Sequence, residues 1–312
     1  MRILMFGRGV TATTYGWALE KAGHEVQFYV RPGRASSYGP TVELDLLDAR
    51  RKIWGEQVLE TWPVSYLESL DSAGDFDLIV VSVSHHRLAE AARALGPHIG
   101  AATVLVFGNV WDEPTHAVPG LPADHVVWGF PGAGGGVAGD GVMRAGLLPT
   151  VILERPVTER QRVVRDLFRG VGVRVTEQAD MRGWLLIHFV MDAGMHSRGA
   201  RLGSLSDMIG KRREFAEALL TSRELLPLLE ARGVDLHRHR GAVRLLRAPT
   251  ALTSGLMAWL IGSVRTARRS LEAHTDPHAE EPRAVCADTL AEARRQGVPV
   301  PRLESAEPYF RT

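Results

Sequence analysis

The sequence predicts an α/β fold in which a doubly wound parallel sheet is followed by an all-helical C-terminal region. A short apolar strand near the N-terminus, Arg2 to Phe6, leads directly into a glycine-rich turn and a helix. Runs of apolar, β-branched residues then alternate with helical patterns, which is typical of strands buried on both faces of a parallel sheet. The alternation ends near residue 176 and long helical patterns follow. We therefore predict two domains, residues 1–176 and 177–312.

The opening turn has the pattern of a dinucleotide-binding site. Gly7, Gly9 and Ala12 fit G-x-G-x-x-[GA] between a strand and a helix. The first glycine permits a tight turn, the second lets the backbone approach a pyrophosphate, and the small third residue lets the helix pack closely on the sheet. The helix is expected at about Thr11 to Ala22, and the amide groups at its start, beside Val10 and Thr11, together with the helix dipole favour phosphate. We predict a Rossmann-type domain; the alternative is a Rossmann-like shell whose site no longer binds a cofactor.

The end of the second predicted strand, Glu25 to Val30, indicates which cofactor would bind. Sites that prefer NAD usually place an Asp or Glu there to bond the ribose 2′-hydroxyl. This chain instead has Arg31 and Arg34, and a guanidinium offers a planar fork that matches phosphate oxygens. The sequence therefore predicts NADP(H), unless these arginines only form a basic surface loop.

The remaining predicted strands place the candidate ligand-binding loops. Strands are expected at residues 77–83, 103–107, 126–130, 149–153 and 171–175, with helices at 87–95 and 159–168. Ligands bind beyond the carboxyl ends of parallel strands, so the candidate loops are Gly7–Ala12, Arg31–Arg34, Ser84–Arg87 and Gly108–Asn109. The glycine-dense segment Pro131–Gly141 is expected to be a flexible hairpin loop.

Composition and charge exclude several classes of protein. The 312 residues are 45% hydrophobic and 23% charged with a net charge of +1, which gives no electrostatic case for nucleic acid or a membrane. The single cysteine, Cys286, excludes an internal disulfide framework and a cysteine-rich metal site. The longest apolar stretch, Leu252 to Val264, is too short to span a bilayer and is predicted to be a buried helix. The first strand leaves no room for a signal peptide, so we expect a cytoplasmic protein.

Several motifs resemble the ketopantoate reductase family. The opening resembles it at Gly7-x-Gly9, Tyr15-Gly16, Leu19, Ala22-Gly-His-Glu-Val26 and Arg31. Two later segments resemble a family helix that ends in Gly-Val and the family's last helix with its exit turn, namely Glu224–Val234 and Ala293–Pro301. The resemblance implies an enzyme that uses NADPH to reduce a 2-oxo acid in pantothenate synthesis.

The resemblance also implies several site residues. Ketone reduction needs donors for the oxygen as it becomes an alkoxide, and it needs a proton source. Asn109 follows a predicted strand and matches the family's asparagine near the nicotinamide and substrate, although it could be a simple turn residue. Glu281, with Glu280 adjacent, matches the glutamate that holds the substrate's hydroxyl end, or could be a solvated carboxylate at a helix start. Ser84 stands where the family usually has a lysine near the cofactor, and Arg87 could compensate for it.

The chain departs from the family in the first long helix of the second domain. The family has a lysine there that polarises the carbonyl and donates the proton, with polar residues one and two turns later. The corresponding residues here are Trp184, His188 and Asp192, and no lysine occurs between Lys52 and Lys211. The three positions are four residues apart and share one helix face. Asp192 could orient His188 and favour its protonated form, leaving one nitrogen for substrate; otherwise the pair is a satisfied core pair and Trp184 is packing.

We therefore predict an NADPH-dependent reductase of a small-molecule carbonyl or imine other than ketopantoate, because Trp184 makes the pocket more apolar and less charged. The alternatives are a non-redox lyase, isomerase, cyclase or ligand-binding protein on the same fold, and a ketopantoate reductase with an unusual general acid. No metal site is predicted, because the adjacent His85 and His86 cannot share one face of a regular element. Besides the substrate, a second copy in a homodimer is the partner we consider.

Overall fold

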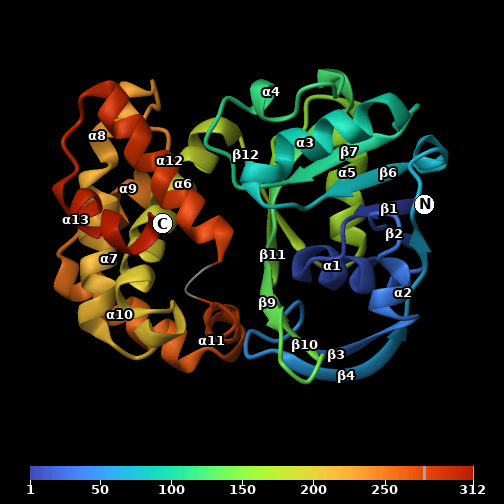
Figure 1. Ribbon diagram of the computed structural model, residues 1–312, viewed down its shortest axis with the longest axis horizontal. Helices are drawn as coiled ribbons and strands as arrows, with labels where there is room; N and C mark the ends of the chain where they lie inside the picture. The colour runs from blue at the N-terminus through green and yellow to red at the C-terminus, as the bar shows by residue number, and fades with distance from the viewer. Residues whose placement is uncertain (277–278, 312) are drawn as a thin grey trace. The chain divides into compact units, whose positions relative to one another are not determined.

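The computed structural model describes residues 1–276 and 279–311 of the chain. They form two compact units, which Figure 1 shows in the colours of the chain. The sheet unit comprises Met1–Gly108 and Asp112–Met181, and the helical unit comprises Asn109–Trp111 and the chain from Arg182 onward. The predicted fold class, a Rossmann-type parallel sheet followed by a helical region, is confirmed.

An eight-stranded sheet lies at the centre of the sheet unit, in the order β12-β11-β8-β7-β6-β1-β2-β5. Neighbouring strands are parallel except β8 and β11, which are antiparallel. Three strands, β1, β7 and β8, have the bounds expected from the sequence, because each is an uninterrupted and mainly apolar run. The strands are β1 (Arg2–Phe6), β2 (Glu25–Tyr29), β5 (Tyr66–Leu67), β6 (Leu78–Val81), β7 (Thr103–Phe107), β8 (Val126–Phe130), β11 (Thr150–Glu154) and β12 (Arg174–Gln178).

A second sheet of four strands, in the order β4-β3-β10-β9, is not indicated by the sequence patterns. Its strands are β3 (Thr41–Asp48), β4 (Glu56–Pro63), β9 (Ala133–Val137) and β10 (Met143–Leu147). The expected hairpin is present, since β9 and β10 pair antiparallel, but β9 occupies much of Pro131–Gly141, so most of this segment is strand and not loop. The glycines instead let two strands approach: Gly135 has φ +151°, and a Cβ there would lie 2.2 Å from the Arg144 carbonyl oxygen.

Helix α1 (Val10–Lys21) packs between the two sheets of this unit (Figure 1). On the large sheet, a Cβ at Gly16 would come within 2.7 Å of the Phe28 ring, so only glycine allows this approach. On the small sheet, the Trp17 indole donates to Glu60 at 3.0 Å. The other helices of the unit are α2 (Ala35–Tyr38), α3 (His85–Leu95), α4 (Pro114–Ala117) and α5 (Glu159–Gly170), with short 3₁₀ turns at Ala73–Asp75, Gly96–His98 and Ala123–His125.

The helical unit is built around α6, whose apolar face packs on α12. Leu186, Phe189 and Val190 of α6 share a buried core with Val285 and Leu290 of α12. Within the described residues, no helix has both the length and the apolar character needed to span a bilayer. The helices are α6 (Met181–Leu202), α7 (Arg212–Glu224), α8 (Leu226–Ala231), α9 (Arg240–Arg247), α10 (Thr250–Ser263), α11 (Arg265–Glu272), α12 (Glu280–Gln296) and α13 (Pro301–Phe310), with a 3₁₀ turn at Ser206–Met208.

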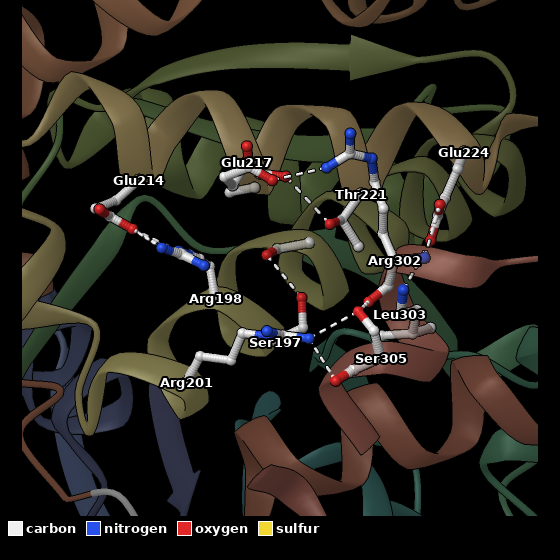
Figure 2. A network of polar contacts seen from close by, with 12 residues as sticks. Ser197, Arg198, Arg201, Glu214, Glu217, Thr221, Glu224, Arg302, Leu303 and Ser305 are labelled. Atoms are coloured by element: carbon white, nitrogen blue, oxygen red, sulfur yellow. Dashed lines mark hydrogen bonds and ion pairs between the residues drawn. The ribbon is translucent and has the colours of Figure 1, made fainter. Parts of the chain in front are cut away.

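Polar contacts join α13 to α6 and α7, as Figure 2 shows. The Glu224 carboxylate accepts from the backbone N–H groups of Arg302 at 3.1 Å and Leu303 at 2.8 Å, so it caps the N-terminus of α13. The Arg302 guanidinium donates to Glu217 at 2.7 Å. Arg201 of α6 reaches the Ser305 hydroxyl at 2.7 Å. Glu224 is the first residue of the segment Glu224–Val234 that resembles the family, so this segment contacts the start of the last helix.

Helix α10 corrects one prediction from the sequence. The stretch Leu252 to Val264 forms a helix as expected, but it is not buried. Leu252, Leu256, Trp259 and Leu260 are 72%, 56%, 59% and 43% exposed. Because both faces of this helix are apolar, the sequence pattern does not reveal which one packs inward.

The crossing of α6 and α7 yields a stability prediction. A Cβ at Gly194 would lie 2.1 Å from the Ser222 hydroxyl and 2.5 Å from the Ala218 carbonyl oxygen, which belongs to the backbone. We expect Gly194→Ala to lower the free energy of unfolding by about 1–3 kcal/mol. Gly241→Ala is the control, because Gly241 lies in α9 with open space around its Cα, and we expect it to raise stability by about 0.5–1 kcal/mol. Urea unfolding of both variants measures the difference; equal effects would contradict the crossing constraint.

Candidate functional site

The glycine turn after β1 has the geometry that a pyrophosphate requires. Gly7 has φ +99°, and its N–H donates to the Tyr29 carbonyl at 3.0 Å, which ties the start of the turn to the end of β2. Gly9 caps α1 with no side-chain bond, and a Cβ placed on it would meet nothing within 4 Å. The first bond of the helix runs from Thr13 N–H to Gly9 at 2.9 Å, so the amides of Val10 to Ala12 lie outside its hydrogen-bond ladder. The first turn of α1 holds no acidic residue, and the residues present fit a dinucleotide phosphate.

Two arginines lie over the Tyr38 ring, beyond the end of β2, and a third is in the adjoining loop. The Arg8 and Arg34 guanidiniums lie over the Tyr38 ring, 4.7 and 5.3 Å from its centre. Arg31 is exposed in the same loop. The sequence patterns point to Arg31 and Arg34 but not to Arg8, although an arginine between the two motif glycines was the signal for it. The three cations lie in loops that would border the ribose of a bound dinucleotide.

The loop after β6 places Ser84 and Arg87 at the start of α3. Ser84 is the N-cap of this helix, and Arg87 is exposed in its first turn. The Arg87 Nε lies 3.3 Å from the His86 imidazole, and the His85 and His86 rings meet edge to face. Among the described residues, no three His, Cys, Asp or Glu side chains are grouped so that they could hold a metal ion.

In the helical unit, Asp192 of α6 joins two of the predicted site residues. The Asn109 side-chain amide donates to Asp192 Oδ2 at 2.6 Å. His188 Nε2 lies 3.5 Å from the same oxygen, and the His188 and Asp192 side chains are each 29% exposed. Asn109 follows β7 by two residues, yet it belongs to the helical unit. Its Oδ1 is buried and has no hydrogen-bond partner in the described chain, so an acceptor is left for a ligand N–H or O–H.

Trp184 stacks on His188 one helical turn away. The two ring centres are 5.2 Å apart and the planes differ by 12°. The His188 imidazole therefore lies between the Trp184 indole on one side and the Asp192 carboxylate on the other. The three residues predicted to share one face of α6 therefore do so in contact with one another.

The ladder on α6 continues to His196, which the sequence reasoning does not include. Four-residue spacing from 184, 188 and 192 leads to this position, so the signal was present. Burial lowers the pKa of His196, while the charges of Asp192 and Glu281 act in the opposite direction. The His196 Nδ1 is buried without a partner among the described residues. Glu281 lies in the first turn of α12, and its influence on His196 places it near the end of the ladder.

The fold and the two sets of residues define the class of protein: an α/β protein with the architecture of the ketopantoate reductases. Residues 3–154, just under half of the chain, match the family described as "Ketopantoate reductase PanE/ApbA". The resemblance noted from the sequence motifs is therefore confirmed. No curated protein sequence matches the chain.

Solved structures share the fold over the whole chain. The 2-dehydropantoate 2-reductase from Geobacter metallireducens GS-15 is 16% identical, with a TM-score of 0.70 over 99% of each chain. A D-mandelate dehydrogenase bound to NADH and anilino(oxo)acetate is 14% identical, with a TM-score of 0.67 over 99% of this chain and 97% of that one. The dimeric ketopantoate reductase from Staphylococcus aureus is 14% identical, with a TM-score of 0.63 over 99% and 98%. At these identities the likeness establishes the fold.

The low pKa of His196 gives a pH prediction. The unfolded chain binds a proton at this imidazole at a higher pH than the folded chain does. Burial of the neutral His196 therefore requires no deprotonation above about pH 6.5, and the free energy of unfolding decreases as the pH falls below that value. We expect the free energy of unfolding to decrease from about pH 7.5 to 5.5, and His196→Gln to flatten that decrease by up to about 1.4 kcal/mol per pH unit. Denaturant titrations across this range measure it.

His24 is the control, because burial and then the N-terminal ammonium also lower its pKa, in the other unit. The His24→Gln change should flatten the profile separately and add to the effect of His196→Gln. A His196→Gln profile parallel to that of the wild type would contradict the assignment.

Proposed function

We propose that this protein is a reductase that uses NADPH to reduce the carbonyl or imine group of a small molecule other than ketopantoate. The observation that carries the proposal is the Trp184–His188–Asp192 array, which stands where the family has a lysine. The glycine turn of the sheet unit supports a dinucleotide cofactor. The family is one of oxidoreductases, which favours redox chemistry over the lyase, isomerase or binding alternatives.

The residues present allow a specific division of labour. NADPH, when bound, would supply the hydride. The turn at Gly7 and Gly9 and the first amides of α1 would hold the pyrophosphate, and Arg8, Arg31 and Arg34 would hold the 2′-phosphate. The printed ligand of the mandelate dehydrogenase is NADH, so the preference for NADPH rests on these arginines alone.

The proton would come from His188. Asp192 orients the imidazole, and the Trp184 ring holds its plane from the other side. The imidazolium then donates a proton to the substrate oxygen as negative charge develops there. Arg182 cannot take this role, because a guanidinium is not a useful proton donor and its Nη2 donates to the Arg232 carbonyl at 2.9 Å. Asn109 and Glu281 are proposed to position the ligand.

The substrate is expected to be bulkier and less acidic than ketopantoate. Trp184 replaces an ammonium with an indole, which removes a cation that would attract a carboxylate and adds apolar area. The dehydrogenase that binds anilino(oxo)acetate shows that this fold can hold an aryl-substituted oxo acid. Aryl and long-chain ketones, oxo acids and cyclic imines are therefore the compounds to test first.

Calorimetric titration with NADPH and NADH, followed by this compound panel with ketopantoate included, tests the proposal. We expect NADPH binding and cofactor oxidation with an apolar carbonyl or imine, and little turnover of ketopantoate. Robust turnover of ketopantoate would favour a ketopantoate reductase with an unusual acid. If neither cofactor binds, the non-redox alternative replaces the proposal.

Arg31 provides the test of cofactor preference. A charge-assisted bond to phosphate contributes about 1.5–3 kcal/mol, so we expect Arg31→Ala to weaken NADPH binding at least tenfold and to leave NADH binding nearly unchanged. Arg51→Ala is the control, since Arg51 is equally exposed in the same unit but outside this loop. Equal losses for NADPH and NADH would show that Arg31 does not contact the 2′-phosphate.

His188 provides the test of the general acid. A positioned acid is worth about 10²–10⁴-fold in rate, so we expect His188→Gln to reduce kcat at least a hundredfold while NADPH affinity stays within about twofold. The Asp192→Asn change should fall between wild type and His188→Gln, because it alters only orientation and charge. Thermal unfolding of both variants comes first; a folded His188→Gln enzyme with unchanged kcat would place the acid elsewhere.

A further inference from the structure

The exposed face of α10 is more apolar than the face that packs inward. We name it the α10 stripe: Leu252, Leu256, Trp259 and Leu260, all exposed. At 100° per residue these positions fall within one third of the helix circumference. The inward face carries Thr253, Ser254, Met257, Ala258 and Ile261, two of them polar. An exposed continuous row of large apolar side chains marks a surface that another body covers.

The stripe is held in place by the helices beneath it. Met257, Ala258 and Ile261 of α10 pack with Phe215 and Ala218 of α7. At the start of α10, Arg223 donates to the carbonyls of Leu246 and Ala248, each at 2.6 Å, and to the Thr250 hydroxyl at 3.0 Å. These bonds fix the corner between α9 and α10, so the stripe is a preformed surface.

Positive charge borders the stripe at both ends. From Leu236 to Leu271 the sequence contains seven arginines and no acidic residue. Arg244 and Arg247 lie on α9, before the stripe, and Arg265 lies on α11, after it; all three are exposed. Arg268 of α11 is ion-paired with Glu272 at 2.6 Å, so its charge is offset. A third group, the exposed Lys211, Arg212 and Arg213, adjoins α10 through the bond from Arg212 to the Ala251 carbonyl at 2.8 Å.

We propose that α9, α10 and α11 dock the protein on an anionic phospholipid bilayer. The leucines and the tryptophan would enter the boundary between headgroups and acyl chains, and the arginines would contact phosphate groups. Charge complementarity selects this occupant. A symmetric contact between two copies would bring the same basic borders together and be repulsive, and nucleic acid offers no apolar phase for three leucines.

Vesicle sedimentation of the full-length protein tests the proposal. We expect it to bind phosphatidylglycerol vesicles and not phosphatidylcholine vesicles, with binding that weakens as salt is added. The Leu256→Ser/Trp259→Ser variant should bind at least tenfold more weakly. The Arg244→Gln/Arg247→Gln variant should lose about thirtyfold, since each charge at an anionic surface is worth about fivefold.

The matched control is Trp54→Ser/Leu59→Ser in the sheet unit. Trp54 and Leu59 are 54% and 71% exposed, much like the residues of the stripe, and we expect this control to bind vesicles as the wild type does. No binding to phosphatidylglycerol, or equal loss in the control, would overturn the proposal. Sedimentation equilibrium distinguishes a bilayer from a second copy of the chain as the occupant of the stripe. If the wild type is a dimer and Leu256→Ser/Trp259→Ser is a monomer, the stripe is a dimer interface and the proposal is overturned.

Discussion

A carboxylate withdrawn from solvent must find donors or a cation, and the polar arrangement of the helical unit follows from that requirement at Asp192. One of its oxygens takes both the Asn109 amide and the His188 imidazole. The hydrogen bond from the Asn109 side chain also anchors the segment Asn109–Trp111, which closely follows β7. In the same segment, Trp111 stacks on Phe189 with ring centres 4.9 Å apart. Asp192 thus holds two site residues that are far apart in the sequence: Asn109, which follows β7, and His188 of α6.

The same carboxylate also sets the geometry of the proposed general acid. His188 has two neighbours that hold its ring, an indole face and a carboxylate, both one helical turn away. His196, two turns further along, lies beside the same carboxylate but is held neutral by burial. The two imidazoles on one helix face therefore have different surroundings: His188 contacts an indole and a carboxylate, whereas His196 is buried.

The sequence was sufficient for the parts of the fold that are locally determined. Strands such as β7 are continuous apolar runs, and the turn at Gly7 needs a residue that tolerates positive φ. The small sheet was not foreseeable in this way. Strand β4 has the sequence EQVLETWP, in which most residues are polar. Strand β9 has the sequence AGGGV, and its strand geometry depends on the backbone of β10 beside it. Long-range pairing of this kind leaves no periodic pattern in either segment.

The candidate site likewise has residues that spacing in the sequence predicts and residues that only the fold brings together. Spacing alone places Trp184, His188 and Asp192 on one face, and it would have reached His196 if extended by one turn. Spacing could not bring Asn109 to Asp192, because 83 residues separate them. The contact of Arg8 with Tyr38 of α2 was likewise beyond spacing, although the place of Arg8 between the two motif glycines was a signal for the residue itself.

The net charge of a whole chain does not describe the charge of any one face of its surface. The chain carries +1 overall and +7 between Leu236 and Leu271, so −6 lies elsewhere. Salt screens charges beyond about 8 Å at physiological ionic strength. Arg268 and Arg238 are ion-paired with Glu272 and Asp235 within that range, whereas acidic groups farther away do not offset Arg244, Arg247 and Arg265. A near-neutral total therefore excludes a uniformly basic protein, but it does not exclude a basic face. The apolar stripe within that face needs a partner that offers both negative charge and an apolar phase, and a bilayer surface supplies both.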